Sequence, residues 1–264
     1  MLTEAKKELK IAFMSIKYAI MREMVNKVTF ILNIIIMIIN NATFIIQWVI
    51  VYQIRDDIGG YSFNQLLMLW GLAAGVFGFS RLFFKNAFHI SESITNGKLD
   101  SYLVQPKNAL LSIITSDSDS SAIGDMLYGY ILLFISGITV QKFILFTIFV
   151  IMGGIISTDI AIILGSLSFW LRKSDLIAET GNALIINFST YPDGIFYGGV
   201  KFILFSIVPI GFVAYIPVKI LSNLNYSMIL IPLAFAITTT ILAFTIFYKG
   251  LKKYSSSSLM LSKI

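Results

Sequence analysis

Apolar residues in this chain form long runs separated by short polar stretches. A helix that crosses the roughly 30 Å core of a bilayer needs about 20 consecutive apolar residues. The runs that approach or exceed this length are residues 28–54, 61–84, 122–138, 143–171, 175–190 and 228–248. The pattern therefore predicts an all-α integral membrane protein with six transmembrane helices.

The first 27 residues have a different pattern. Apolar residues recur there at helical spacing and basic residues surround them: Leu9, Phe13, Ile16, Ile20 and Met24 among Lys6, Lys7, Lys10, Lys17 and Arg22. A basic amphipathic helix of this kind lies in the membrane interface. We expect residues 1–27 to form such an interfacial helix, with an ordinary solvated helix as the alternative.

Composition supports the membrane interpretation. Of the 264 residues, 57% are hydrophobic and 13% are charged, whereas soluble domains carry about 25% charged residues. The chain has no cysteine, which excludes disulfides, thiolate metal sites and cysteine nucleophiles. The formal net charge is +6. In a membrane protein, excess Lys and Arg first reflect the orientation of the spans, so we expect no nucleic-acid partner.

The positions of the basic residues favour six spans over seven. With the N-terminus in the cytoplasm, six spans place 16 of the 20 Lys and Arg residues on the inner side, in residues 1–27, 81–107, 172–173 and 249–263. Seven spans would move the final four lysines outside, against the positive-inside bias. We therefore expect both termini to be cytoplasmic.

Residues 192–221 contain too many helix breakers for an ordinary span. Tyr191-Pro192 begins this segment, and Pro209 and Pro217 interrupt it. Broken backbone at membrane depth persists only where protein or a water-filled cavity covers it. We expect a re-entrant hairpin that enters from the outer side after the fifth span, with a kinked full span as the alternative.

Four amides recur along the first span. Asn26, Asn33, Asn40 and Gln47 are seven residues apart, so they form one polar stripe on a helix. An unpaired amide is costly in lipid, so the stripe should face another helix or a cavity. Packing between subunits and a substrate pathway are the two interpretations, and they are compatible.

Asp159 lies within the fourth span, where a carboxylate is by default a candidate functional group. The alternative is a packed, hydrogen-bonded acid, because Ser157 and Thr158 precede it. Asp125 lies nearer the start of its span than Asp159 does, and a protease dyad requires two carboxylates that share a proton. An intramembrane hydrolase is therefore disfavoured.

Other enzyme chemistry is also disfavoured. The single histidine, His89, has no cysteine or second histidine with which to bind a metal. The segment "GIFYGGVK" lacks the Gly-Lys-Ser/Thr of a phosphate-binding loop. We expect no metal or cofactor on this chain, so any ATP must bind to another chain.

The loop of residues 86–121 is the longest polar stretch. Gly97 is placed to end a helix that begins near Asn86, and Pro106 ends a second short helix over residues 98–105. The segments "ESITNGKLDSYLVQP", "SAIGDMLYGY" and "NFSTYPDGIFYGGVKFILFSIVPIGFVAYIP" together resemble permease subunits of ABC-2-type transporters. The likeness is to the branch of small six-span permeases that pair with a separate ATPase and often a second permease.

The resemblance implies roles for two regions. In such permeases a short cytoplasmic coupling helix inserts into the ATPase, and a re-entrant hairpin caps the pathway outside. The coupling residues would be Gly97, Lys98, Leu99, Asp100, Tyr102, Leu103, Val104 and Pro106, with the apolar side chains in contact with the ATPase and the charged ones setting register. The outer gate would comprise Tyr191, Pro192, Pro209 and Pro217.

The resemblance also implies the assembly. We expect an exporter subunit in a bacterial plasma membrane, with a second identical or related permease and two ATPase subunits that hold ATP and Mg. Scarce intramembrane charge favours amphiphilic or hydrophobic cargo, such as a drug or antimicrobial peptide. The rival is a secondary transporter driven by an ion gradient, with Asp159 as its ion site. The segment "TSDSDSSAI" before the third span departs from the family pattern, either as a helix cap or as a partner contact.

Overall fold

The computed structural model describes residues 2–171, 174–206 and 208–255. The predicted inner-side charges Arg172, Lys173 and Lys263 lie outside these ranges. The longer helices are α1 (Leu2–Glu23), α2 (Lys27–Tyr52), α3 (Phe63–Phe84), α7 (Ser121–Ile135), α8 (Val140–Ser166), α9 (Asp175–Ser189) and α12 (Leu230–Leu251). The shorter ones are α4 (Ile90–Thr95), α5 (Asp100–Leu103), α6 (Ala109–Ile114), α10 (Gly198–Ser206) and α11 (Ile216–Asn223).

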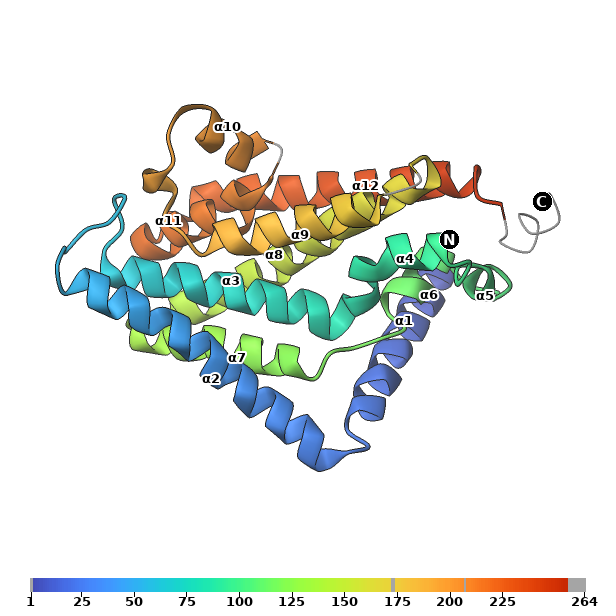
Figure 1. Cartoon of the computed structure of the whole chain (residues 1–264), viewed down its shortest axis with the longest axis horizontal. Helices are drawn as coiled ribbons and strands as arrows, with labels where there is room; N and C mark the ends of the chain where they lie inside the picture. The colour runs from blue at the N-terminus through green and yellow to red at the C-terminus, as the bar shows by residue number, and fades with distance from the viewer. Residues whose placement is uncertain (1, 172–173, 207, 256–264) are drawn as a thin grey trace.

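The helices form an elongated bundle. Helices α3, α7, α8, α9 and α12 run along it, and α1 crosses one end at a steep angle (Figure 1). That end also carries α4, α5 and α6, whereas α11 and the loop between α2 and α3 lie at the opposite end (Figure 1). The first residues form a helix, α1, and its direction suits a helix that lies along a membrane surface.

In the described part of the chain, four segments are long and apolar enough to cross a membrane: Lys27–Tyr52, Phe63–Thr95, Val140–Phe169 and Tyr226–Leu251. A fifth arises if the bent pair Gly198–Ser206 and Gly211–Asn223 is one span. Helices α7 and α9 occupy the other two predicted positions but have 15 residues each, which reach only about 22 Å. The six-span count therefore stays a prediction.

The predicted hairpin is sharply broken. The segments Gly198–Ser206 and Gly211–Asn223 meet at 76°. Pro209 lies at this break, and the second segment starts with a π-helical turn, Gly211–Tyr215. Pro217 is buried and lies two residues after the end of this turn, near the start of α11. Both a broken span and a re-entrant loop remain compatible with this geometry.

The packing of α3 against α7 depends on glycine. A Cβ atom added to Gly129 would lie 2.5 Å from the Gly71 carbonyl oxygen, and one added to Gly78 would lie 2.6 Å from that of Ala122. Only glycine permits this approach of two backbones, which is the packing mode that small residues provide in membranes. Helix α3 starts with a capping box in which Ser62 and Gln65 each bond to the other's backbone N–H.

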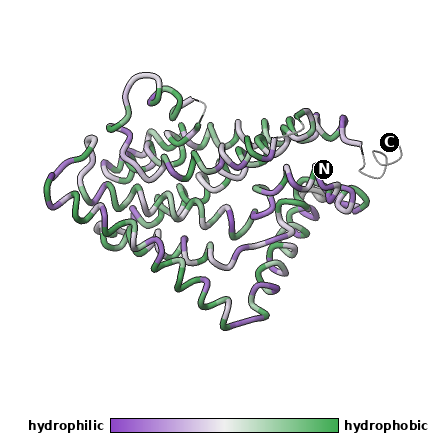
Figure 2. Tube along the Cα trace, viewed as in Figure 1, coloured by the Kyte–Doolittle hydropathy of each residue, from purple (hydrophilic) through white to green (hydrophobic). Residues whose placement is uncertain are grey.

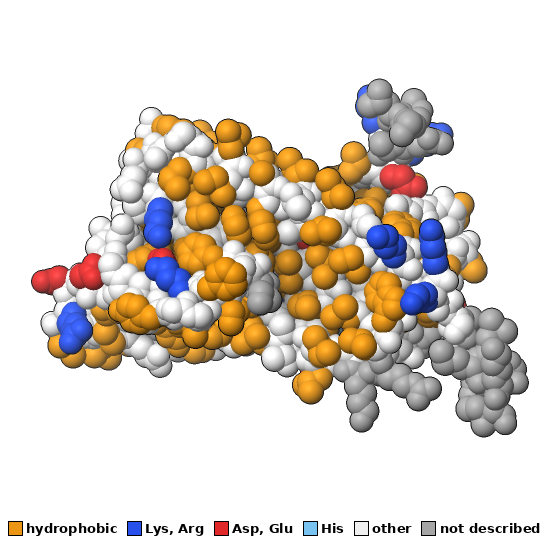
Figure 3. Space-filling view, turned by 90° about the horizontal axis from the view of Figure 1, so that it is seen from above, with side chains coloured by type: hydrophobic (Ala, Val, Ile, Leu, Met, Phe, Trp, Pro, Cys, Tyr) orange, Lys and Arg blue, Asp and Glu red, His pale blue; other side chains and the backbone are white. Residues whose placement is uncertain are grey.

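The surface agrees with a membrane-embedded bundle. The long helices are mostly hydrophobic, whereas the loop between α2 and α3 is hydrophilic (Figure 2). On the face shown in Figure 3, hydrophobic side chains cover the middle, and Lys and Arg appear only towards the two ends. Such an apolar band would face water unfavourably in a soluble protein of this size.

Candidate functional site

The predicted coupling segment is a tight, helical loop. Gly97 has φ +70°, the left-handed conformation that ends helices, and α4 ends just before it at Thr95. The second helix is shorter than predicted: α5 spans four residues, Asp100–Leu103, rather than residues 98–105.

The side chains of this segment divide into buried and exposed sets. Leu103 is 39% exposed and Val104 is 83% exposed, whereas Leu99 has no exposed surface. The prediction that Leu99 contacts an ATPase is therefore corrected. The chain reverses at Gly97, the Leu99 N–H donates to the Ser93 carbonyl at 3.0 Å, and the leucine packs into the chain's own interior.

The charged residues of the segment have local partners. The Lys98 ammonium lies 2.6 Å from the Glu92 carboxylate, and both side chains are exposed, so the pair stabilises the chain by at most about 1 kcal/mol. Asp100 lies beside Tyr254, past the end of α12. Burial and the Asp100 carboxylate together raise the pKa of Tyr254 to about 12. The predicted coupling segment thus contacts the residues that follow α12.

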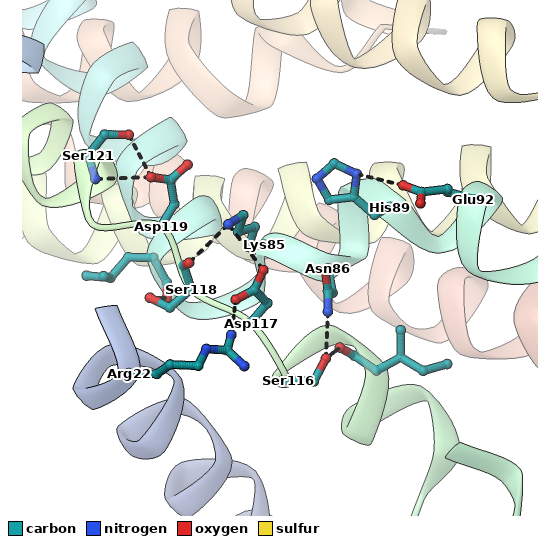
Figure 4. A network of polar contacts seen from close by, with 12 residues as sticks. Arg22, Lys85, Asn86, His89, Glu92, Ser116, Asp117, Ser118, Asp119 and Ser121 are labelled. Atoms are coloured by element: carbon teal, nitrogen blue, oxygen red, sulfur yellow. Dashed lines mark hydrogen bonds and ion pairs between the residues drawn. The ribbon is translucent and has the colours of Figure 1, made fainter. Parts of the chain in front are cut away.

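A polar cluster ties this segment to the bundle (Figure 4). The Ser116 hydroxyl lies 3.0 Å from the Tyr102 hydroxyl and accepts from the Asn86 amide at 2.6 Å. Asn86 belongs to the 3₁₀ turn Lys85–His89 that directly follows α3. Ser116 therefore joins α5 to the end of α3. We call residues 116–119 the inner hub, after the side on which the predicted topology places them.

The inner hub also contacts α1 and α7. Asp117 forms ion pairs with Arg22 of α1 and, at 3.1 Å, with Lys85. Asp119 accepts from the Ser121 backbone N–H at 3.0 Å and from its hydroxyl at 2.7 Å, at the start of α7. The Ser- and Asp-rich segment is thus an internal junction at the start of α7, although sequence alone left its role open.

The four amides of the predicted stripe have different surroundings. Asn26 caps α2 by accepting from the Thr29 N–H at 3.2 Å. Asn33 donates to the Ser120 hydroxyl at 3.0 Å, so it packs within the chain. Asn40 and Gln47 are exposed. Gln47 also lines a cavity between α2, α3, α7 and α9, which leaves Asn40 as the member that faces outward.

Sequence reasoning missed the best-buried polar contact of α2. Asn41, next to the predicted stripe, donates to Asp125 Oδ1 of α7 at 2.6 Å. Asp125 is 3% exposed and lines the same cavity as Gln47. The adjacent pair Asn40-Asn41 within an apolar run was the available signal, because two consecutive amides cannot both lie on one stripe.

Asp159 is buried and hydrogen-bonded to a neighbouring helix. Its carboxylate accepts from the hydroxyls of Thr239 at 3.1 Å and Thr240 at 2.7 Å, both on α12. It is 4% exposed, and it makes no ion pair with the residues described. These contacts join α8 to α12 and match the hydrogen-bonded alternative. Within the described ranges, no three His, Asp or Glu side chains converge to hold a metal ion.

Asp193 organises the end of the bundle opposite α5, which the predicted topology places outside, and sequence reasoning did not select it. Its Oδ1 accepts from the Tyr61 hydroxyl at 2.7 Å, and its Oδ2 lies 3.2 Å from Lys201 and 3.4 Å from Lys219. Burial would raise the pKa of Asp193, but the Tyr61 hydrogen bond and the two lysines outweigh it and hold the pKa below its usual value. We call these four residues the outer clasp.

Of the predicted gate residues, Tyr191 and Pro192 directly precede Asp193 of the outer clasp, whereas Pro209 lines a separate pocket beside α8 and α9. Pro192 precedes the 3₁₀ turn Asp193–Ile195, and the Tyr191 ring packs edge-on against Trp48 at 5.9 Å. Next to Asp193, a Cβ on Gly194 would lie 1.9 Å from the Gly59 carbonyl oxygen. The loop between α2 and α3 is therefore in direct backbone contact with the start of the hairpin.

These features define a multi-pass helical membrane protein. The family model described as ABC-2 family transporter protein matches residues 37–258. The chain belongs to this family and is an ABC-2-type permease, a transport subunit rather than an enzyme. No curated protein and no solved structure matches the chain.

Proposed function

We propose that this chain is the membrane-spanning subunit of an ATP-driven exporter, and that α5 receives the motion of a separate ATPase. The observation that carries the proposal is the inner hub. It joins the exposed α5 to α1, to the end of α3 and to the start of α7. A push on α5 would therefore reach several helices at once.

The proposed complex contains two ATPase subunits, which bind ATP and Mg, and a second identical or related permease. It resides in a bacterial plasma membrane with both termini cytoplasmic, and six passes connect the two sides. The exposed amide of Asn40 supports a protein partner at α2, since an unpaired amide in lipid is costly.

The transmission step depends on rigid connections. ATPase closure would move α5, and the Tyr102–Ser116–Asn86 contacts would carry that movement to α3. At the far end of the bundle, Tyr61 lies two residues before α3 and donates a hydrogen bond to Asp193 of the outer clasp. A shift of α3 would therefore strain the clasp and release the hairpin, which opens the pathway outward.

The cargo in this proposal is amphiphilic or hydrophobic, drug-like or similar to an antimicrobial peptide. Support comes from the cavity between α2, α3, α7 and α9, whose lining combines aromatic and apolar side chains with a few polar groups. That combination is typical of small-molecule sites.

Copurification tests the proposal. The double variant Leu103→Glu with Val104→Glu places charge on exposed apolar positions of the coupling segment. We expect it to insert normally but to lose the ATPase or to uncouple hydrolysis from transport. Val140 is 77% exposed at the start of α8, so Val140→Glu is the matched control. Normal copurification and transport in the double variant would refute the coupling role of α5.

A gradient-driven secondary transporter that uses Asp159 is the rival. The two threonine hydroxyls that satisfy Asp159 give the carboxylate a structural role without an ion. Family membership favours the ATP-driven reading.

A further inference from the structure

A cavity of about 350 Å³ lies between α2, α3, α7 and α9. This volume is within the range of small-molecule sites. Its polar lining includes Asn41, Gln47 and Asp125, and its aromatic lining includes Trp48, Trp70 and Tyr191. No Lys, Arg or His belongs to the lining among the described residues, so Asp125 is the one charged group that it presents there.

The Asp125 carboxylate is incompletely satisfied. Oδ1 accepts from Asn41, but the buried Oδ2 has no hydrogen-bond partner among the residues that the structure describes. Asp125 makes no ion pair within the described part of the chain. Arg81 is near enough to act on it electrostatically, yet its guanidinium lies over the rings of Phe77 and Phe88, at 5.1 and 4.5 Å. A buried carboxylate without a paired cation is costly, and a bound cation would remove that cost.

The aromatic side chains of the cavity complement the Asp125 carboxylate as binding groups for a cation. Trp70 stacks on Phe44 with ring centroids 6.0 Å apart, and Trp48 meets Tyr191 edge-on. The Trp70 indole N–H is buried and has no hydrogen-bond partner in the described ranges. Indole faces attract cations and pack against apolar groups, so the lining suits a ligand that carries both.

We propose that this cavity binds small organic cations with an aromatic body, with Asp125 as the counter-charge and the tryptophans as the apolar walls. This inference rests on the proposed function, for which it names a substrate class. Binding itself needs no ATPase, so it can be measured on the purified full chain, and failure of one proposal is distinguishable from failure of the other.

Tryptophan fluorescence of the full chain in detergent gives a direct readout. Two of the three tryptophans line the cavity, and Trp170→Phe removes the third. The probes are tetraphenylphosphonium and tetraphenylborate, which share a shape and have opposite charges. We expect saturable quenching by the cation and at least about tenfold weaker binding of the anion, equivalent to about 1.4 kcal/mol. Equal binding of the two probes would overturn the proposal.

Two variants locate the charge. Asp125→Asn keeps the shape and should weaken tetraphenylphosphonium binding at least about tenfold, whereas Asp56→Asn, in the exposed outer loop, should leave it unchanged. If Asp125→Asn does not fold, Asn187→Lys serves instead, because Asn187 is exposed on α9 and also lines the cavity. It should weaken cation binding, and Asn187→Gln should not. Wild-type affinity in the folded Asp125→Asn or Asn187→Lys protein would contradict the assignment.

Discussion

The Tyr102 hydroxyl lies 3.0 Å from the Ser116 hydroxyl, and this contact connects α5 to the inner hub. Tyr102→Phe removes it but keeps the ring. We expect normal ATPase binding and a several-fold loss of transport per ATP hydrolysed, since one hydrogen bond is worth about 1 kcal/mol.

A double-mutant cycle with Ser116→Ala provides the control. If the two hydroxyls act together, the double variant should be scarcely worse than Ser116→Ala alone. Additive losses would mean that each residue acts through other contacts.

The outer clasp should make stability depend on pH. The pKa of Asp193 is held below its ordinary value, so its charged form stabilises the fold above the unfolded pKa of about 3.9, and acidification removes that contribution. Asp193→Asn should lower the melting temperature at pH 7, at a cost of about 1–3 kcal/mol. The difference from wild type should shrink below about pH 4. A difference that stays constant down to pH 3 would disprove the linkage.

The backbone contact between α3 and α7 should not tolerate a methyl group. Gly129→Ala would place Cβ 2.5 Å from the Gly71 carbonyl oxygen and should destabilise the chain by about 1–3 kcal/mol. Thermal melting in detergent measures this. Gly199→Ala is the control, because open space surrounds that position. Equal melting temperatures for Gly129→Ala and wild type would mean that α3 and α7 can move apart at little cost in free energy.

Cross-linking can test the proposed dimer in a chain without natural cysteines. Asn40 is exposed on α2, so Asn40→Cys should form a disulfide between two permeases of identical sequence under oxidation. Asn33→Cys should not, because that position packs on Ser120 of the same chain. For a heterodimer, the partner permease must carry a cysteine at the facing position. Equal cross-linking at both positions would contradict this orientation of α2.

Asp159→Asn separates the two transport mechanisms. Asparagine keeps an oxygen that can accept from Thr239 or Thr240, so ATP-driven transport should continue at near wild-type rate. Transport assays in vesicles with ATP or with an ion gradient measure this. Abolished transport in a well-folded variant that responds to the gradient would favour the secondary transporter.

Much of the helical framework followed from sequence patterns. Apolar runs located α2, α3, α8 and α12, because a helix in lipid must be apolar along its whole length. Gly97 marked the end of α4, because its left-handed conformation is a local property of the backbone. Order and spacing of short segments over the chain indicated the family.

Tertiary structure decided which side chains meet. Leu99 and Leu103 are four residues apart in similar sequence surroundings, yet one is buried and the other is exposed, because the chain turns Leu99 against residues distant in sequence. Asp125 is hydrogen-bonded to Asn41, which is 84 positions away in the sequence, and Asp193 to Tyr61, which is 132 positions away. Sequence periodicity determines which face of a helix is polar. The partner of a buried polar group depends on how the helices pack, which periodicity does not encode.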